Sequence, residues 1–318
     1  MVVLCVIQDI SLRSRPYARI ANRTGTHHCL FDIRMILSNL IRKNPFPFER
    51  QSMTKSLLRI IFLLHSLIAV VFITSCNIET LKIGPVNTDS TSVEMGGAHS
   101  LQAEFSMGTG SINLSGGAAN LLDGTVTYNV ADWRPEVLYT VEDEIGILNV
   151  NQPSYKDTLP VNIGDVEYEW DLQLNSNLPM DLLVTVGAGE GDLDLSDLQL
   201  DSFEFKGGAG GVSIDLSGSS VNDLDVALGA GDVVLDLGGE WFHDVKATIK
   251  GGLGRVTLIL PASGGVKVTT QGMLSKITAP GFANEGGVYT NDAFGQSDVS
   301  FLIDIESGIG EIVMELGA

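Results

Sequence analysis

The chain has 318 residues, with 39 Asp and Glu side chains against 19 Lys and Arg, and a formal net charge of −20. This excess of acid argues against a nucleic-acid-binding protein, because phosphate recognition requires Lys and Arg. The hydrophobic content of 44% argues against an intrinsically disordered protein. The 36 glycines follow no Gly-X-Y period, which excludes collagen.

Residues 1–52 are interpreted as a leader outside the fold. They hold eight basic and three acidic side chains, together with Cys5 and Cys29. A bacterial lipoprotein signal normally begins close to the start Met, and the signal-like segment here begins at Met53. We therefore expect an over-long gene model whose true start is Met53, with a genuine N-terminal extension as the alternative.

Residues 53–75 have the pattern of a lipoprotein signal peptide. Lys55 and Arg59 form a short basic region, and residues 60–73 are apolar apart from one His and one Ser. This apolar run is shorter than the roughly 20 residues of a membrane-spanning helix and suits the core of a signal peptide. A buried helix that ends in a Cys is the alternative interpretation.

The end of this segment resembles a bacterial lipobox. Ile73, Thr74 and Ser75 supply the aliphatic and small residues, and Cys76 is the predicted lipidation site. Two acyl chains on Cys76 would hold the protein stably at a membrane, where a single chain is marginal. The sequence thus predicts a membrane-anchored lipoprotein of the bacterial cell envelope that faces the extracytoplasmic side, with residues 76–94 as a spacer.

The predicted mature chain is more acidic than the whole. Residues 76–318 hold 9 basic and 36 acidic side chains, a formal charge of −27. Their single Cys is the predicted anchor, so we expect no internal disulfide. Such a charge also makes anionic partners improbable.

A repeat is the most specific signal in the sequence. The segments GAGEGDLDL, GAGGVSIDL, GAGDVVLDL and GLGRVTLIL begin at Gly187, Gly208, Gly229 and Gly252, with spacings of 21, 21 and 23 residues. Outlying copies begin at Gly108 and Gly308, and a degenerate copy lies near Gly272. The predicted repeat corners are Gly187, Gly189, Gly208, Gly210, Gly229, Gly231, Gly252, Gly254, Gly308 and Gly310.

The residues around each corner alternate with period 2. Val212, Ile214 and Leu216 fall on one face after a corner, and Leu224 and Val226 fall on one face before the next. Strict alternation indicates half-buried strands. Each unit is therefore predicted to be a strand, a Gly-x-Gly corner, a strand and a loop. The glycines are expected to supply positive φ or close approach between stacked corners.

These units predict an all-β fold. A unit of about 21 residues buries its apolar face only by stacking on further copies. We expect a β-solenoid or a ladder of stacked β-hairpins over residues 167–318, with a β-sandwich as the alternative. Residues 95–152 are predicted to form a smaller N-terminal β unit, and residues 153–166 a polar linker.

The repeats resemble the toast-rack family. The resemblance rests on WDLQLNSNLPMDLLVTVGAGEGDLDLSDL from Trp170, on the later Gly-rich units and on VYTNDAFGQSDVSFLIDIESGIGEIVMEL from Val288. The stretch that starts at Ser92 (SVEMGGAHSLQAEFSMGTGSINLSGG) is similar to the domain that precedes toast-rack in such lipoproteins. The resemblance implies stacked β-strands at the cell envelope, relatives among LiaF-type stress proteins and adhesin-like domains, and no enzymatic activity. LiaF-type proteins differ in carrying transmembrane helices before this domain.

Few residues suggest catalysis. The predicted mature chain has no Cys besides the anchor, no Gly-x-Ser-x-Gly motif, and two isolated histidines, His99 and His243. Strands rather than a helix follow the glycines, which argues against nucleotide binding. The many acids allow a two-carboxylate glycosidase in principle, but no aromatic cluster marks a sugar groove. Trp133, Trp170 and Trp241 are well separated, so we expect them to pack at ends or between units.

Cofactors are not expected, and no metal site is predicted. Asp192, Asp215 and Asp232 are the first candidates for calcium, because carboxylates near Gly-rich turns are suitable ligands. Calcium β-rolls, however, require tandem nonapeptides, whereas these units recur at 21 residues. The acids are better explained as groups that keep the outer sheet face soluble. Tyr289 and Phe294 are expected to cover the last units.

The sequence thus predicts a lipid-anchored β-repeat protein that acts as a non-catalytic, adhesin-like binding or scaffolding module. Its partner would be an unidentified envelope protein or glycan, contacted through a sheet face or a solenoid edge. An envelope-stress regulator resembling the LiaF extracytoplasmic domain is the main alternative, and a carbohydrate-active enzyme is the third.

Overall fold

The computed structural model describes residues 82–153 and 166–317. These residues belong to one compact unit, Asn77–Ala318. The predicted leader, the signal segment and the lipobox with Cys76 lie outside the described residues, as do residues 154–165 of the predicted linker. Among the described residues, no helix is both long and apolar enough to cross a membrane.

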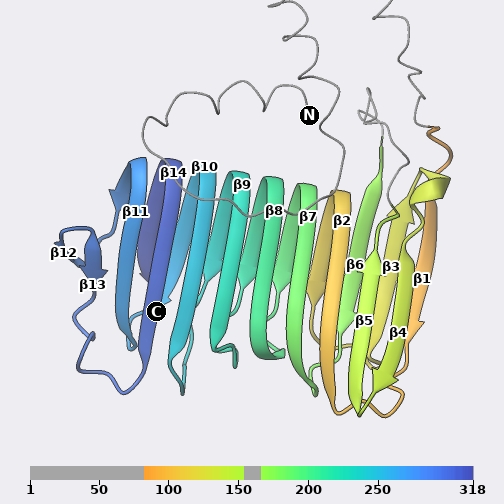
Figure 1. Ribbon diagram of the computed structural model, residues 1–318, viewed down its shortest axis with the longest axis horizontal. Helices are drawn as coiled ribbons and strands as arrows, with labels where there is room; N and C mark the ends of the chain where they lie inside the picture. The colour runs from red at the N-terminus through yellow and green to blue at the C-terminus, as the bar shows by residue number, and fades with distance from the viewer. Residues whose placement is uncertain (1–81, 154–165, 318) are drawn as a thin grey trace, which may run out of the picture. The chain divides into compact units, whose positions relative to one another are not determined.

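The described chain forms a 14-stranded sheet (Figure 1). Its main path runs in the order β1-β3-β6-β2-β7-β8-β9-β10-β14-β11-β13-β12, and β4 and β5 join it through β2. The strands are β1 (Asn87–Val93), β2 (Ser100–Ser115), β3 (Leu122–Tyr128), β4 (Glu136–Glu142), β5 (Ile145–Asn151), β6 (Tyr168–Leu174), β7 (Pro179–Asp194), β8 (Gln199–Asp215), β9 (Asp223–Asp236), β10 (Val245–Pro261), β11 (Gly265–Thr278), β12 (Ala283–Glu285), β13 (Val288–Thr290) and β14 (Ser300–Gly317).

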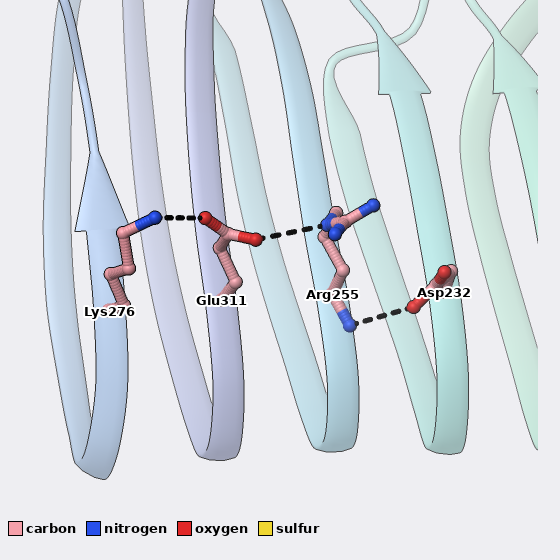
Figure 2. A network of polar contacts seen from close by, with 4 residues as sticks. All are labelled: Asp232, Arg255, Lys276 and Glu311. Atoms are coloured by element: carbon pink, nitrogen blue, oxygen red, sulfur yellow. Dashed lines mark hydrogen bonds and ion pairs between the residues drawn. The ribbon is translucent and has the colours of Figure 1, made fainter.

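Each long strand turns back at its Gly-rich corner and so has a first arm before the corner and a second arm after it. Figure 2 shows neighbouring ribbons turning back in the same place. The pairing of β2 demonstrates the two arms, because its residues 100–106 pair with β5 and its residues 111–115 pair with β6. Successive rungs β7, β8, β9 and β10 pair in parallel along both arms. This stacked ladder confirms the predicted all-β repeat fold.

The apolar core lies between the two arms. In β8, Phe203 and Phe205 of the first arm and Val212 and Ile214 of the second arm are buried, while the alternate side chains face outward. The predicted alternation is therefore confirmed. Burial of one such side chain contributes about 1.5–3 kcal/mol, and the pattern recurs in every rung.

The last strand in the sequence does not lie at the end of the stack. β14 pairs in parallel with β10 on one side and with β11 on the other. β10 carries Lys246, Lys250 and Arg255, whereas β14, which lies between β10 and β11, is rich in carboxylates. Opposite charges on adjacent strands contribute roughly 0.2–1 kcal/mol per pair, which favours this order over simple succession.

The predicted boundary between residues 95–152 and 167–318 does not coincide with a break in the sheet. β2 pairs with β7 from Leu101 to Ser115. β5 and β6 together act as one divided rung, with its first arm at residues 145–151 and its second arm at residues 168–174. The antiparallel strands β4, β3 and β1 flank this end of the ladder.

Candidate binding surface

The corners stack in register along the ladder. Gly110, Gly189, Gly210, Gly231 and Gly254 follow one another on adjacent strands. A Cβ on Gly210 would lie 1.7 Å from the carbonyl oxygen of Gly189, and φ at Gly210 is +135°. The first glycine of each corner is also crowded: a Cβ on Gly208 would lie 2.2 Å from the oxygen of Gly187. At Gly210 positive φ and close approach thus both favour glycine, whereas at Gly208 only close approach does.

Glycine at so many aligned positions leaves a hollow beside the corners, which we call the corner groove. It is a shallow hollow, wide open to solvent, with a volume of about 580 Å³, and it crosses β8, β9, β10, β14 and β11. Its floor is mostly main chain and small side chains, such as Ala227, and its charged lining groups are Lys250 and Glu306. The hollow on the outer face of the first arms of β5, β2, β7 and β8 is smaller, at about 300 Å³.

Two large apolar side chains stand exposed next to the corner groove. Leu253 is 55% exposed and Ile309 is 53% exposed, and the two are partners across the β10–β14 pair. They occupy the middle position of the Gly-x-Gly corner, where β7, β8 and β9 carry Ala188, Ala209 and Ala230. Leu253 and Ile309 therefore form an apolar ridge beside the groove on β10 and β14, where the corners of β7, β8 and β9 present only the methyl group of alanine.

A row of alternating charges follows the corners on the outer face of the second arms (Figure 2). Glu311 Oε1 accepts a hydrogen bond from Lys276 Nζ at 2.8 Å, and its Oε2 accepts one from Arg255 Nε at 3.2 Å. The backbone N–H of Arg255 donates to Asp232 Oδ1 at 3.0 Å. The pKa of Glu311 is lowered, first by its hydrogen bond with Lys276 and then by the charge of that lysine.

The calcium candidates are not brought together. Asp192, Asp215 and Asp232 lie at different depths along their second arms, and Asp192 is paired with Ser213 across β7 and β8. Asp215 Oδ1 accepts the backbone N–H of Ser217, and Asp232 Oδ1 accepts that of Arg255. Within residues 82–153 and 166–317, no three His, Cys, Asp or Glu side chains form a group that could hold a metal ion.

The histidines are also far apart. His99 precedes β2 and contacts the exposed Glu144 at 3.4 Å, whereas His243 precedes β10 and lies against the ring of Trp241. Four strand spacings of about 4.8 Å separate β2 from β10, or roughly 19 Å. The two imidazoles therefore cannot act on one substrate atom.

The carboxylates with displaced pKa values do not fit general acids. The pKa of Asp123 is lowered to about 2, mainly by the backbone N–H of Asn120 and the side chain of Ser92. The pKa of Asp244 is lowered by the backbone N–H and the hydroxyl of Ser300. A glycosidase acid requires a raised pKa, which is the opposite direction.

Aromatic side chains fill the core beside the divided rung. Trp133 in the short 3-10 helix η1 (Ala131–Trp133) packs edge-on against Tyr168, with ring centroids 5.7 Å apart. Trp170 is fully buried, 6.0 Å from Tyr168. The indole N–H groups of Trp133 and Trp170 and the hydroxyl of Tyr168 have no partner within hydrogen-bonding geometry in the described part of the chain, although Trp170 lies close enough to lower the pKa of Tyr168 against the larger effect of burial. Burial raises the pKa of Tyr168.

At the other end of the ladder, Tyr289 is half-buried against the core, and β13, which contains it, pairs with β11. Phe294 is 37% exposed. Of the two residues expected to cover the last units, Tyr289 packs against the core and Phe294 is exposed. Trp241 packs edge-on against Phe301 of β14.

Sequence reasoning missed two features of this surface. Leu253 and Ile309 were available as signals, since the corners GLG and GIG replace the GAG of earlier copies. For Gln152, by contrast, no pattern in the sequence indicates its structural role. Its Oε1 accepts the backbone N–H groups of Gly108 at 2.7 Å and Thr109 at 3.0 Å, so it serves the corner of β2 where the divided rung has no Gly-x-Gly corner of its own.

Comparison with known families agrees with this architecture. The model of the N-terminal domain of toast_rack (DUF2154) matches residues 82–227 and again residues 206–259. The chain belongs to the toast_rack N-terminal family. The first match to the toast_rack model includes the predicted linker at residues 153–166, and the pairing of β2 with β7 likewise joins the two sides of this linker. The second match to the same model covers β9 and most of β10.

Solved structures also resemble the chain. A candidate cell adhesion protein from Clostridium sporogenes ATCC 15579 is 30% identical, with a TM-score of 0.56, and the match covers 73% of this chain and 100% of that one. A candidate adhesin from Bacteroides fragilis NCTC 9343 is 13% identical, with a TM-score of 0.33 and coverage of 72% and 97%. One from Parabacteroides distasonis ATCC 8503 is 10% identical, with a TM-score of 0.29 and coverage of 74% and 98%. No curated protein matches the sequence.

Proposed function

We propose that this toast_rack protein is a non-catalytic, adhesin-like binding module of the bacterial cell envelope. The observation that carries the proposal is the corner groove together with Leu253 and Ile309, which are exposed directly after the groove-lining residues Gly252 and Gly308. The similarity to a candidate cell adhesion protein over the whole length of that protein supports the same class.

The corner groove fits an extended partner. It crosses five strands, so a ligand that follows it runs along the stacking direction and spans roughly 19 Å of strand spacings. Leu253 and Ile309 supply an apolar contact, and Lys250 and Glu306 supply polar contacts. A glycan chain or an extended envelope polypeptide has this shape and this mixture of apolar and polar groups.

Attachment through Cys76 would place this surface at the membrane. The supporting observation is the lipobox-like Ile73-Thr74-Ser75-Cys76 after a short apolar run. We expect labelled palmitate to be incorporated into the wild type and not into Cys76→Ala, and we expect the variant to leave the membrane fraction. Incorporation into Cys76→Ala, or its continued sedimentation with membranes, would contradict the anchor.

The binding surface is tested with a double substitution, Leu253→Asp with Ile309→Asp. Both side chains are more than half exposed, so stability should change by less than about 0.5 kcal/mol. Leu138→Asp is the matched control, since Leu138 is 60% exposed on β4, away from the corners. Binding of the labelled full chain to isolated cell envelopes and to purified peptidoglycan is measured for all three proteins.

The proposal expects the double variant to bind at least about tenfold more weakly than wild type, a difference of about 1.4 kcal/mol, and the control to bind normally. Equal binding by wild type and the double variant would contradict a role for the corner groove. Release of soluble sugars from the peptidoglycan by wild type would instead identify an enzyme.

A further inference from the structure

The outer face of the second arms of β9, β10, β14 and β11 carries two aligned rows, which together we call the second-arm patch. The row nearest the corners is charged, and the next row is β-branched. The charged row is Asp232, Arg255, Glu311 and Lys276, and the β-branched row is Val234, Thr257, Val313 and Thr278.

The charges of the first row alternate in sign along the stack, from negative at Asp232 to positive at Lys276 (Figure 2). The side chains remain accessible: Arg255 is 54% exposed, Lys276 is 76% exposed and Glu311 is 26% exposed. Exposed ion pairs contribute at most about 1 kcal/mol each, so these groups can exchange or share partners at little cost.

An alternating row of four is complementary to itself when it is reversed. Consider a two-fold axis in the plane of the face that runs parallel to the strands and passes between β10 and β14. Rotation about this axis reverses the order of the strands in the second copy. Each row then faces the same row of the second copy. Asp232 then faces Lys276 of a second copy, and Arg255 faces its Glu311. We propose that the second-arm patch docks a second copy of this chain in a two-fold symmetric dimer.

The β-branched row suits such a face-to-face contact. Val234 is 36% exposed, and Thr257 and Val313 are half-buried within their own sheet. Reversal places Val234 opposite Thr278 and Thr257 opposite Val313 of the second copy. These short side chains allow two sheet faces to approach to about 10 Å, the usual spacing of packed sheets.

The other in-plane axis is disfavoured by charge. An axis along the stacking direction through the β-branched row would place the charged row against the third outward row, which includes Asp236, Ile259 and Glu315. Asp232 would then face Asp236, and Glu311 would face Glu315. With the favoured axis, Ile259 of one copy faces Glu315 of the other in this third row. An apolar side chain opposite a carboxylate is not complementary, so only the first two rows contribute to the proposed interface.

The size of the second-arm patch sets the strength of the dimer. Four strands at about 4.8 Å and five residues at about 3.3 Å give a face of roughly 300 Å² per copy. Stable dimers bury about 800 Å² per partner, so this dimer is expected to be weak, with a Kd of about 10 μM or above. The charge order of the patch selects the partner. The small area limits the affinity, and so does the repulsion between two copies that each carry a formal net charge of −20.

Complementary charge variants test the proposal. In a homodimer of Arg255→Glu, two carboxylates face each other at both central positions. In a homodimer of Glu311→Arg, two guanidinium groups face each other at both central positions. In a heterodimer of the two variants, all four facing pairs have opposite charge. Sedimentation velocity of the full chain up to about 300 μM in detergent measures self-association, and energy transfer between labelled variants measures the mixture.

The proposal expects concentration-dependent dimers of wild type, at least about tenfold weaker self-association of each variant, and recovery in the equimolar mixture. A monomeric wild type, undiminished association of either variant alone, or no recovery in the mixture would each overturn it. Thermal unfolding checks that each variant folds. The outer pair Lys276→Asp and Asp232→Lys follows the same logic and replaces the central pair where a central variant does not fold.

Discussion

Replacement of a stacked corner glycine is expected to be strongly destabilising. In Gly210→Ala, the new Cβ would lie 1.7 Å from the oxygen of Gly189, and φ at this residue is +135°. The Cβ must move by about 1.7 Å to reach an ordinary contact of about 3.4 Å, and this movement separates two rungs at the corner. Backbone strain of about 1–3 kcal/mol and overpacking of about 1–3 kcal/mol together predict a loss of about 4 kcal/mol.

Two matched variants separate the contribution of backbone strain from that of overpacking. A Cβ on Gly211 would come no closer than 3.9 Å to a neighbour, so Gly211→Ala should change stability by less than about 0.5 kcal/mol. Gly117 has φ +98° with nothing within 4 Å of a Cβ, so Gly117→Ala should show the strain alone, about 1–2 kcal/mol. Urea unfolding measures all three, and a loss of 4 kcal/mol lowers the midpoint by at least about 1.3 M, since m in urea is about 1–3 kcal/mol/M. Equal stability of Gly210→Ala and Gly211→Ala would refute the stacking argument.

Three further predictions concern the N-terminal half of the ladder. Gln152→Ala should cost about 1–2 kcal/mol in urea unfolding because two corner N–H groups lose their acceptor, whereas Gln152→Glu keeps an acceptor and should cost less. The pKa of Asp123 is lowered from 3.8 to about 2, so its stabilisation should be present above about pH 4 and lost as pH falls toward about 2. In acid unfolding, Asp123→Asn should lack this component, and an unchanged profile would argue against it. Tyr168→Phe removes a buried hydroxyl that has no partner and should raise the free energy of unfolding by about 1 kcal/mol, so a clear loss of stability would reveal a missing partner.

Local sequence patterns predicted the repeating part of the fold because each rung is specified within about 21 residues. Alternation fixed which side chains of β8 are buried, and the glycine spacing fixed the position of the corners. These features depend on backbone sterics and on one buried face, which the sequence displays directly.

The order of the rungs could not be predicted in the same way. The insertion of β14 between β10 and β11 depends on contacts between strands that are distant in sequence, such as Arg255 with Glu311 and Lys276 with Glu311. The union of β2 with β7 likewise depends on long-range pairing. A repeat pattern indicates that units stack, but the pattern is the same for every order of stacking.

The candidate binding surface was predicted only as a class of surface. The sequence predicted either a sheet face or a solenoid edge as the binding surface, and it named no residues of that surface. Its location at β10 and β14 depends on Leu253 and Ile309 becoming neighbours across a parallel pair, although they are far apart in the sequence. Side chains that meet through strand order are visible only after the order is known.

Hydrogen–deuterium exchange of the full chain bound to soluble cell-wall fragments tests the central claim most directly. We expect slower exchange of the corner amides of β9, β10 and β14, at residues 227–231, 250–254 and 306–310, with little change on the outer face of the first arms. Slower exchange confined to other surfaces, or no binding to any cell-wall or envelope fraction, would contradict a binding role for the corner groove.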